Sequence, residues 1–286
     1  MSYLEHIKAC NNFDASAFRP FEIAGLRVGW VRHDKVVHLE QFSDVFDVSK
    51  RSISLTPDLK EFEERSTAVS LVVSTLSSQG VLPPSRDELY PVALDRNVPP
   101  LMRIERTACP FFGIGASGVH MNGYVCREDG LHIWVARRAW DKVTYPGMLD
   151  NMVAGGQPLG IGLKENMIKE CGEEAGIPRE IAARVQPVGL IVYHHQSEDG
   201  VKPDRQYCFD LELPIDFEPV AMDGEVDEFM LWPVEQVVAK VRDTFEFKFN
   251  CNLVIIDFLI RHGVLDPDKE PDYAALCRGL HKSDGF

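Results

Sequence analysis

The sequence has no apolar run of the roughly 20 residues that a membrane-spanning helix needs, so we expect no such helix. Positive charge is also scarce, because 30 lysines and arginines stand against 44 aspartates and glutamates, for a formal charge of −14. An acidic surface repels the phosphates of nucleic acids and of anionic membranes, so we expect neither as a partner. The N-terminus lacks the basic and apolar segments of a secretory signal, which favours a cytoplasmic location.

Several signatures of chemistry are missing too. The seven cysteines are odd in number, irregularly spaced and without a C-x-x-C pair, which indicates reduced, mostly buried thiols. Residues 113–118 match G-x-G-x-x-G, but they precede a predicted strand instead of opening a helix, so we interpret them as a flexible linker. His194 and His195 have no cysteine or carboxylate at ligand spacing. We expect a polar loop there, with a substrate or general-base role as the alternative.

What is present suits a folded protein of two domains. Apolar residues make up 45% of the 286 residues and charged residues 26%, which is enough for a sizeable core. Prolines and glycines concentrate in residues 95–118, the best candidate boundary. We therefore predict an N-terminal α+β domain of unknown role at 1–115, a second domain at 116–265, and a polar, loosely held tail at 266–286.

Local patterns predict the elements of both domains. Ser2 and Glu5 match a capping box that opens a short helix. Residues 26–40 alternate like two strands joined at 33–35, and Pro57 is typical of the first position of a helix that ends at Gly80. In the second domain we predict strands at 119–126, 131–136, 188–193, 206–213 and 226–232, and helices at 163–175, 233–241 and 253–260.

The most informative stretch is a glycine-rich loop from Gly155 that leads into the helix at 163–175. On that helix Glu170, Glu173 and Glu174 are spaced i, i+3 and i+4, so they share one face. Their repulsion costs a few tenths of a kcal/mol per pair, and the C-terminal end of a helix dipole disfavours anions further. A bound Mg²⁺ would remove this conflict, whereas a solvated acidic face is the alternative.

This stretch resembles the Nudix box, G-x5-E-x7-R-E-U-x-E-E-x-G-U, in which U is aliphatic. When the box is aligned on Gly155, the matching residues are Glu170, Glu173, Glu174, Gly176 and Ile177, with Cys171 at the first aliphatic position. Two positions depart from the box. Ile161 replaces its first glutamate, and Lys169 replaces its arginine. The lysine keeps the positive charge but lacks the bidentate fork of a guanidinium.

The resemblance implies a fold and a metal-dependent reaction. The fold would be a Nudix α/β/α sandwich around a mixed sheet, preceded here by a smaller α+β domain. Glu170 and Glu174 would bind Mg²⁺ or Mn²⁺, Glu173 would act as ligand or base, and the Gly155 carbonyl would complete the site. Glu174 would thereby also serve catalysis, in which water attacks a small-molecule diphosphate. Cys171, on an apolar stripe with Met167, is expected to be structural.

Further residues are candidates for the same site. Glu225 follows Gly224 in a loop that leads to a strand, and similar loops in several Nudix enzymes supply a metal ligand or general base. Three basic residues after the second strand of the domain are candidates for binding the diphosphate, namely Arg137, Arg138 and Lys142. Two aromatic residues, Trp140 and Tyr145, are candidates for stacking on the rest of the substrate.

Residues 145–156 and 223–226 resemble the Nudix proteins related to thiamin pyrophosphokinase, which carry an extra N-terminal domain. That resemblance implies hydrolysis of thiamin diphosphate or its oxidised analogues. Nucleotide-linked diphosphates such as ADP-ribose or NADH are alternatives. So are an isomerase that would use Cys126 or Cys208 with a glutamate, and a non-catalytic ligand-binding module. The sequence does not indicate the oligomeric state.

Overall fold

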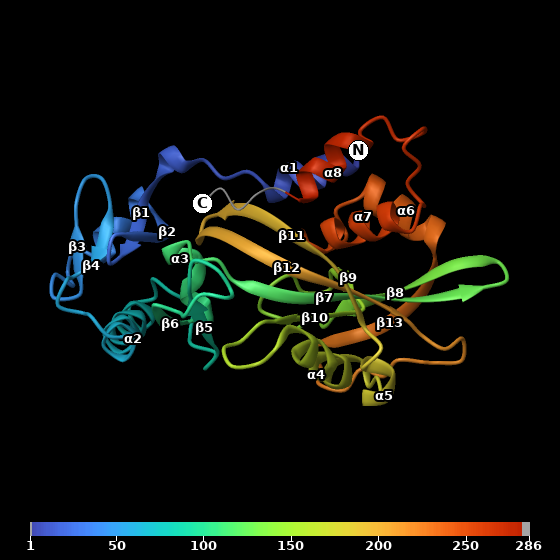
Figure 1. The fold of residues 1–286 in the computed structure, drawn as a ribbon, viewed down its shortest axis with the longest axis horizontal. Coiled ribbons are helices and arrows are strands. Elements are labelled where there is room, and N and C mark those ends of the chain that lie inside the picture. The colour runs from blue at the N-terminus through green and yellow to red at the C-terminus, as the bar shows by residue number, and fades with distance from the viewer. Residues whose placement is uncertain (1, 282–286) are drawn as a thin grey trace.

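The computed structural model describes residues 2–281, which form two sheets, a short hairpin and the helices around them (Figure 1). The N-terminal part holds a four-stranded sheet of order β2-β1-β4-β3 and the hairpin β5-β6. Its strands are β1 (Phe18–Ile23), β2 (Leu26–Arg32), β3 (Phe46–Val48), β4 (Ile53–Leu55), β5 (Leu89–Val92) and β6 (Met102–Glu105). Its helices are α1 (Tyr3–Cys10), α2 (Phe62–Ser78) and α3 (Cys109–Phe112), with short 3-10 turns at Ala15–Ala17, His33–His38 and Arg106–Ala108.

The second part is built on a seven-stranded mixed sheet. Its central order is β11-β12-β7-β8-β13, β10 pairs with β7, and β9 pairs with β8. The strands are β7 (Ser117–Arg127), β8 (Gly130–Arg138), β9 (Leu149–Asn151), β10 (Val153–Gly156), β11 (Gln186–Ser197), β12 (Gly200–Glu212) and β13 (Val226–Pro233). The helices are α4 (Leu163–Ala175), α5 (Arg179–Ala182), α6 (Val234–Asp243), α7 (Cys251–Arg261) and α8 (Tyr273–Leu280). The pair β12–β7 is parallel, and the other pairs of this sheet are antiparallel.

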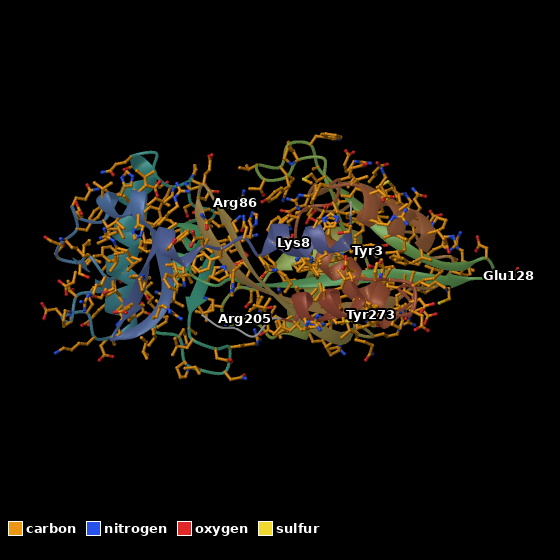
Figure 2. The ribbon with its side chains drawn as sticks, turned by 90° about the horizontal axis from the view of Figure 1, so that it is seen from above. Tyr3, Lys8, Arg86, Glu128, Arg205 and Tyr273 are labelled. Atoms are coloured by element: carbon orange, nitrogen blue, oxygen red, sulfur yellow. The ribbon has the colours of Figure 1, made fainter. Side chains whose placement is uncertain are left out.

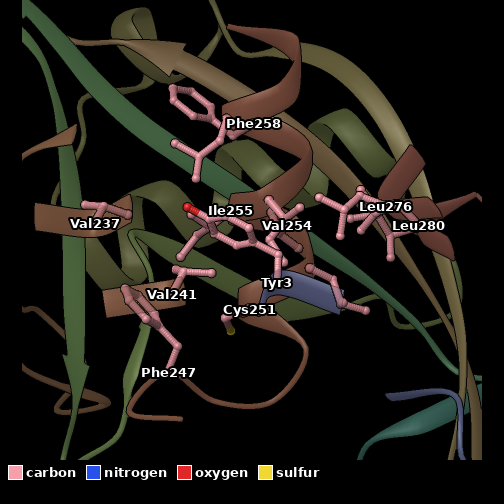
Figure 3. Close-up of a cluster of buried hydrophobic side chains, with 14 of the residues drawn as sticks. Tyr3, Val237, Val241, Phe247, Cys251, Val254, Ile255, Phe258, Leu276 and Leu280 are labelled. Carbon is pink, nitrogen blue, oxygen red and sulfur yellow. The ribbon is translucent and has the colours of Figure 1, made fainter. Parts of the chain in front are cut away.

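Helices cover both faces of this sheet, which confirms the expected sandwich (Figure 1). One face packs on α4 and α5 through a core that includes Met121, Phe209 and Met167. The other face packs on α6, α7, α1 and α8, and Figure 3 shows Tyr3 of α1 among apolar side chains of α6, α7 and α8. A third core fills the N-terminal part. Within residues 2–281, no helix combines the length and apolar character that crossing a bilayer requires.

Most of the predicted elements are confirmed. The capping box of Ser2 and Glu5 is present, and the helix at 163–175 has the predicted bounds. The predicted strands of the second domain correspond to β7, β8, β11, β12 and β13. The helix after Pro233 is α6, and the helix at 253–260 is α7.

Two predictions for the N-terminal part are wrong. Only β2 occupies the start of 26–40, because His33–His38 forms a 3-10 turn and β1 is the partner strand. The helix assigned to start at Pro57 begins at Phe62 instead, where Glu61 and Glu64 form a reciprocal capping box. That box satisfies the free backbone N–H groups of the first turn, so it sets the start of the helix.

Three further expectations need correction. His194 and His195 lie within β11 and not in a loop. The stretch at 113–118 precedes β7 as expected, but it is tightly packed, since a Cβ added at Gly113 would lie 2.6 Å from the Trp30 nitrogen. The C-terminal segment is not loose either, because α8 packs on α1, and Leu276 and Leu280 are buried in the core that includes Tyr3. Figure 2 shows Tyr3 and Tyr273 in the same part of the molecule. Residues 282–286 of the predicted tail lie outside the described residues.

Candidate metal and active site

The glycine loop and α4 place the acidic residues against the edge of β10. Gly155 and Gly156 pair with Val119 and Gly118 of β7, and the chain then turns into α4 at Gly162. Two buried amides hold this loop: Gln157 donates to the Ile161 carbonyl at 2.7 Å, and Asn166 donates to the Gly156 carbonyl at 2.8 Å. The amides were not singled out from the sequence, since only the folded loop shows what they bind.

Glu170 and Glu174 point from α4 toward β10. Glu174 is only 6% exposed, and it accepts a hydrogen bond of 2.9 Å from the backbone N–H of Ala154. The Glu170 side chain passes so closely over Gly155 that an added Cβ would lie 2.6 Å from its Oε1. A side chain at this position would therefore displace the Glu170 carboxylate.

The electrostatics of the two carboxyl groups are unfavourable. Burial raises the pKa of Glu174 well above its ordinary value, and the charges of Asp150, Glu170 and Glu225 raise it further despite the Ala154 N–H. Burial is also the main cause of the raised pKa of Glu170. The charges that act most strongly on Glu174 are thus those of three carboxylates. A buried carboxylate without a cation is costly, and hard oxygen donors are what Mg²⁺ prefers, so the donor set fits a divalent cation.

Glu173 is placed differently from its two neighbours. Its side chain is 52% exposed and forms an ion pair with Lys169 one helical turn earlier. Lys169 also lies 3.6 Å from Glu170, so one ammonium group pairs with two box glutamates. The lysine thus performs the pairing that the resemblance assigns to the arginine of the box, as a single charge without a fork.

Glu225 belongs to the same electrostatic centre. Its charge raises the pKa of both Glu170 and Glu174, and its carboxylate lies 2.7 Å from the ammonium of Lys142. Burial raises the pKa of Glu225, but Lys142, Arg138 and Arg106 together hold it below its ordinary value. Glu225 is therefore ionised at neutral pH and half exposed beside the box glutamates.

The other basic candidates are bound to the protein itself. Arg137 lies 2.8 Å from Glu228 and donates to the Gly147 carbonyl. Arg138 lies 2.8 Å from Asp150 and donates to the carbonyls of Tyr145 and Thr144. These bonds hold the loop between β8 and β9. A role of either arginine in substrate binding stays a prediction.

The two aromatic candidates lie in different surroundings. Trp140 is 68% exposed, and its ring covers Gly147, where an added Cβ would overlap the indole. Tyr145 has a φ of 54°, which is strained for a residue with a side chain. Its ring lies 5.5 Å from that of Phe249, and the Phe249 ring stacks on His195 at 4.5 Å. The structure therefore brings Tyr145 and His195 into one aromatic group and leaves Trp140 outside it.

A second group of donors lies buried on the α7 side of the sheet. His120, Asp150 and Cys251 offer ligand atoms within 4.8 Å of one another. Asp150 is already paired with Arg138 and, at 3.7 Å, with Lys248. Although burial raises the pKa of Asp150, Lys248, His120 and Arg138 lower it to about 2, and burial lowers the pKa of His120 to about 4. The charge of Asp150 is thus balanced by side chains of the protein.

Comparisons with known proteins place this chain. Residues 2–116 match a family model described as a domain of unknown function, DUF4743. Nudix hydrolase 24, chloroplastic, from Arabidopsis thaliana is 43% identical over 99% of this chain and 78% of its own length. Nudix hydrolase 20, chloroplastic, from the same plant is 42% identical over the same shares. The chain belongs to the Nudix hydrolase family. This Nudix hydrolase is accordingly an enzyme that acts on acid anhydrides in phosphorus-containing compounds.

Solved structures also resemble this Nudix hydrolase. The NUDIX domain of Shewanella oneidensis NrtR, solved with ADP ribose, covers 53% of this chain and 90% of its own, with 12% identity and a TM-score of 0.43. DR0079 from Deinococcus radiodurans covers 68% of this chain and all of its own, with 18% identity and a TM-score of 0.41.

Proposed function

We propose that this Nudix hydrolase cleaves the diphosphate of a small molecule with the help of Mg²⁺ or Mn²⁺. The observation that carries the proposal is the meeting of Glu170 and Glu174 at Gly155, where both side chains are largely buried and the charges that act most strongly on Glu174 are those of other carboxylates. Such an arrangement is stabilised when a divalent cation binds.

Each residue then has a definite role. Glu170, Glu174 and the Gly155 carbonyl would hold the cation, which when bound neutralises phosphate charge and lowers the pKa of water. Glu225, whose charge acts on both of these glutamates and whose pKa is held below its ordinary value, would accept the proton of the attacking water. Lys169 keeps Glu173 and Glu170 in place on the helix surface. Glu173, which like Glu225 is half exposed and paired with a lysine, is the other candidate for the ligand or base role.

For the substrate we propose thiamin diphosphate or its oxidised analogues. The support is the resemblance of residues 145–156 and 223–226 to the thiamin-related Nudix proteins. The aromatic group of Tyr145, Phe249 and His195 also offers flat surfaces for a heterocycle. An acidic protein does not repel a positively charged thiazolium ring, whereas it disfavours a long polyanion.

The rival functions make different use of the same chain. An isomerase needs a cysteine facing a glutamate. Cys208 is instead buried in the core that includes Tyr193. Cys126 does meet a glutamate, Glu212, but in a groove that contains none of the box glutamates. A non-catalytic binding module would rest on the departures at Ile161 and Lys169, but Lys169 still pairs with the box glutamates.

The test is a panel of substrates with and without metal. We expect phosphate release from thiamin diphosphate and its oxo and oxy analogues that requires Mg²⁺ or Mn²⁺, with a lower kcat/KM for ADP-ribose and NADH. A clear preference for either nucleotide would overturn the thiamin assignment but leave the hydrolase standing. Rearrangement of a carbon skeleton would favour the isomerase, and binding without turnover would favour the module. The cytoplasmic location stays a prediction.

A further inference from the structure

The hairpin β5–β6 of the N-terminal part touches the glycine loop of the active site. The hydroxyl of Tyr90 lies in the space that a side chain at Gly156 would occupy, closer to it than Glu88 Oε1 at 3.1 Å or the Tyr90 ring carbon Cζ at 3.2 Å. Farther along the loop, the backbone N–H of Leu159 donates to the carbonyl of Leu89 at 3.5 Å. One strand of the N-terminal part is therefore packed directly against the residues that position the metal ligands.

This contact brings Arg106 to the same place. Arg106 follows β6, and its backbone N–H donates to the Glu88 carbonyl at 2.8 Å. Its guanidinium lies 2.7 Å from the Glu88 carboxylate and 5.8 Å from the centre of the Tyr90 ring. The Arg106 side chain remains 43% exposed. Within residues 2–281, Glu88 is the one side chain to which this guanidinium donates, through Nη1, so Nε and Nη2 are available to another acceptor.

The charge of Arg106 acts on Glu225 of the active site and on Lys248 of the second donor group. It contributes to the lowered pKa of Glu225 on the exposed side, after Lys142 and Arg138. On the buried side it opposes the raised pKa of Lys248. Of the three cations that act on Glu225, Lys142 is paired with Glu225 itself and Arg138 is fully used within its own loop. Arg106 is the cation among them that has both solvent exposure and free donors.

We propose that the N-terminal domain supplies Arg106 to the active site as a substrate-binding residue. Its guanidinium binds one phosphate of the substrate diphosphate, the one farther from the box glutamates. Glu88 and Tyr90 are the positioning residues that aim it. A guanidinium fork matches two phosphate oxygens, and such charge-assisted bonds are among the strongest that a side chain makes. This role rests on the proposed function, because it assumes that the substrate carries a diphosphate.

The experiment measures binding apart from turnover. Titration calorimetry with methylenediphosphonate, a diphosphate that cannot be hydrolysed, is carried out on the full chain in Mg²⁺. We expect Arg106→Ala to weaken binding about tenfold or more, the effect of losing charge-assisted bonds to an anion. Arg106→Lys should weaken it by less, since it keeps the charge. The matched control is Arg103→Ala, because Arg103 is also half exposed and paired with a glutamate, Glu63, in the same domain but away from the site.

Equal affinities of the Arg106→Ala and Arg103→Ala variants would overturn the proposal, as would a lack of binding by the unmodified protein. If Arg106→Ala does not fold, the comparison uses Arg106→Lys, and an unchanged affinity there overturns it too. Kinetics on the best substrate then separate the role of Arg106 from the proposed hydrolase function. A raised KM with a nearly unchanged kcat supports Arg106 in binding. Weakened binding in a protein that hydrolyses nothing would reject the proposed function and keep the inference.

Discussion

Adding one methyl group at Gly156 should uncouple the two domains at the active site. The backbone of Gly156 is ordinary strand, so Gly156→Ala adds no strain of its own. The new Cβ, however, would overlap the Tyr90 hydroxyl, so the Tyr90 side chain, the hairpin or β10 must move. Overpacking of this kind costs about 1–3 kcal/mol. Because β10 carries Gly155 and the Ala154 N–H that binds Glu174, we also expect a clear loss of turnover.

A second substitution should relieve the overlap. In Tyr90→Phe the hydroxyl is gone, and the atoms nearest to the added Cβ become Glu88 Oε1 at 3.1 Å and the ring carbon at 3.2 Å. The double variant should therefore recover most of the lost stability and activity, with a coupling of about 1 kcal/mol or more in a double-mutant cycle. Urea unfolding and substrate turnover are measured in parallel. Gly162→Ala is the control, since nothing lies within 4 Å of its added Cβ.

The contact would be refuted if Gly156→Ala were as harmless as Gly162→Ala. It would be refuted equally if Tyr90→Phe gave no recovery, because the overlap would then involve another atom. A recovery of stability without a recovery of turnover would mean that the hydroxyl itself serves the reaction.

Three further predictions concern buried ionisable groups. Glu174→Gln should abolish most turnover and the Mg²⁺-induced rise in Tm, yet it should raise the Tm measured without metal. The pKa of Glu174 is higher in the folded than in the unfolded protein, so its ionisation lowers the stability of the fold as pH rises above the unfolded pKa. Glutamine cannot ionise and removes that cost. An Mg²⁺-induced rise as large as in the unmodified protein would reject the ligand assignment. Cys171→Ala should lower stability modestly, by about 1–2 kcal/mol, and leave kcat unchanged, since the thiol is fully buried beside Met167; loss of activity without unfolding would argue against this. Asp150, whose folded pKa is lowered to about 2, should contribute roughly 2 kcal/mol that is present above its unfolded value near 3.8 and is lost as pH falls toward 2. The check is the free energy of unfolding in urea at about pH 5 and about pH 3. It should fall less between these pH values in Asp150→Asn than in the unmodified protein.

Local sequence was sufficient where an element carries its own signals. The helix at 163–175 lies between Gly162 and Gly176, the second of which has a φ of 62°, and its apolar stripe is buried as expected. Local signals misled where two of them competed. Pro57 is a good helix start, but the capping pair of Glu61 and Glu64 lies closer to the helix that forms. Val36 and Val37 are typical of strands, yet their segment turns as a 3-10 helix.

Other features depend on residues far apart in the chain. The segment of α8 was predicted to be a loose tail because its composition is polar, although Tyr273, Leu276 and Leu280 lie on one face at helical spacing. Their burial requires α1, from the other end of the chain. The meeting of Tyr90 with Gly156 also has no local signal, since hairpin and loop belong to different domains. The ion pair of Asp150 with Lys248 likewise has no local signal, because the two residues lie far apart in the chain.

Two buried carboxylates in this protein differ in how the neighbouring side chains balance their charge. Asp150 and Glu174 are both almost fully buried, and burial raises the pKa of each. Around Asp150, Lys248 and Arg138 supply positive charge and reverse the shift, so a divalent cation there would have to displace or repel them. Around Glu174 the neighbouring charges are carboxylates, and the shift stays upward. We therefore propose the glycine loop, and not the group around Asp150, as the place where a bound cation would lower the free energy of the folded protein.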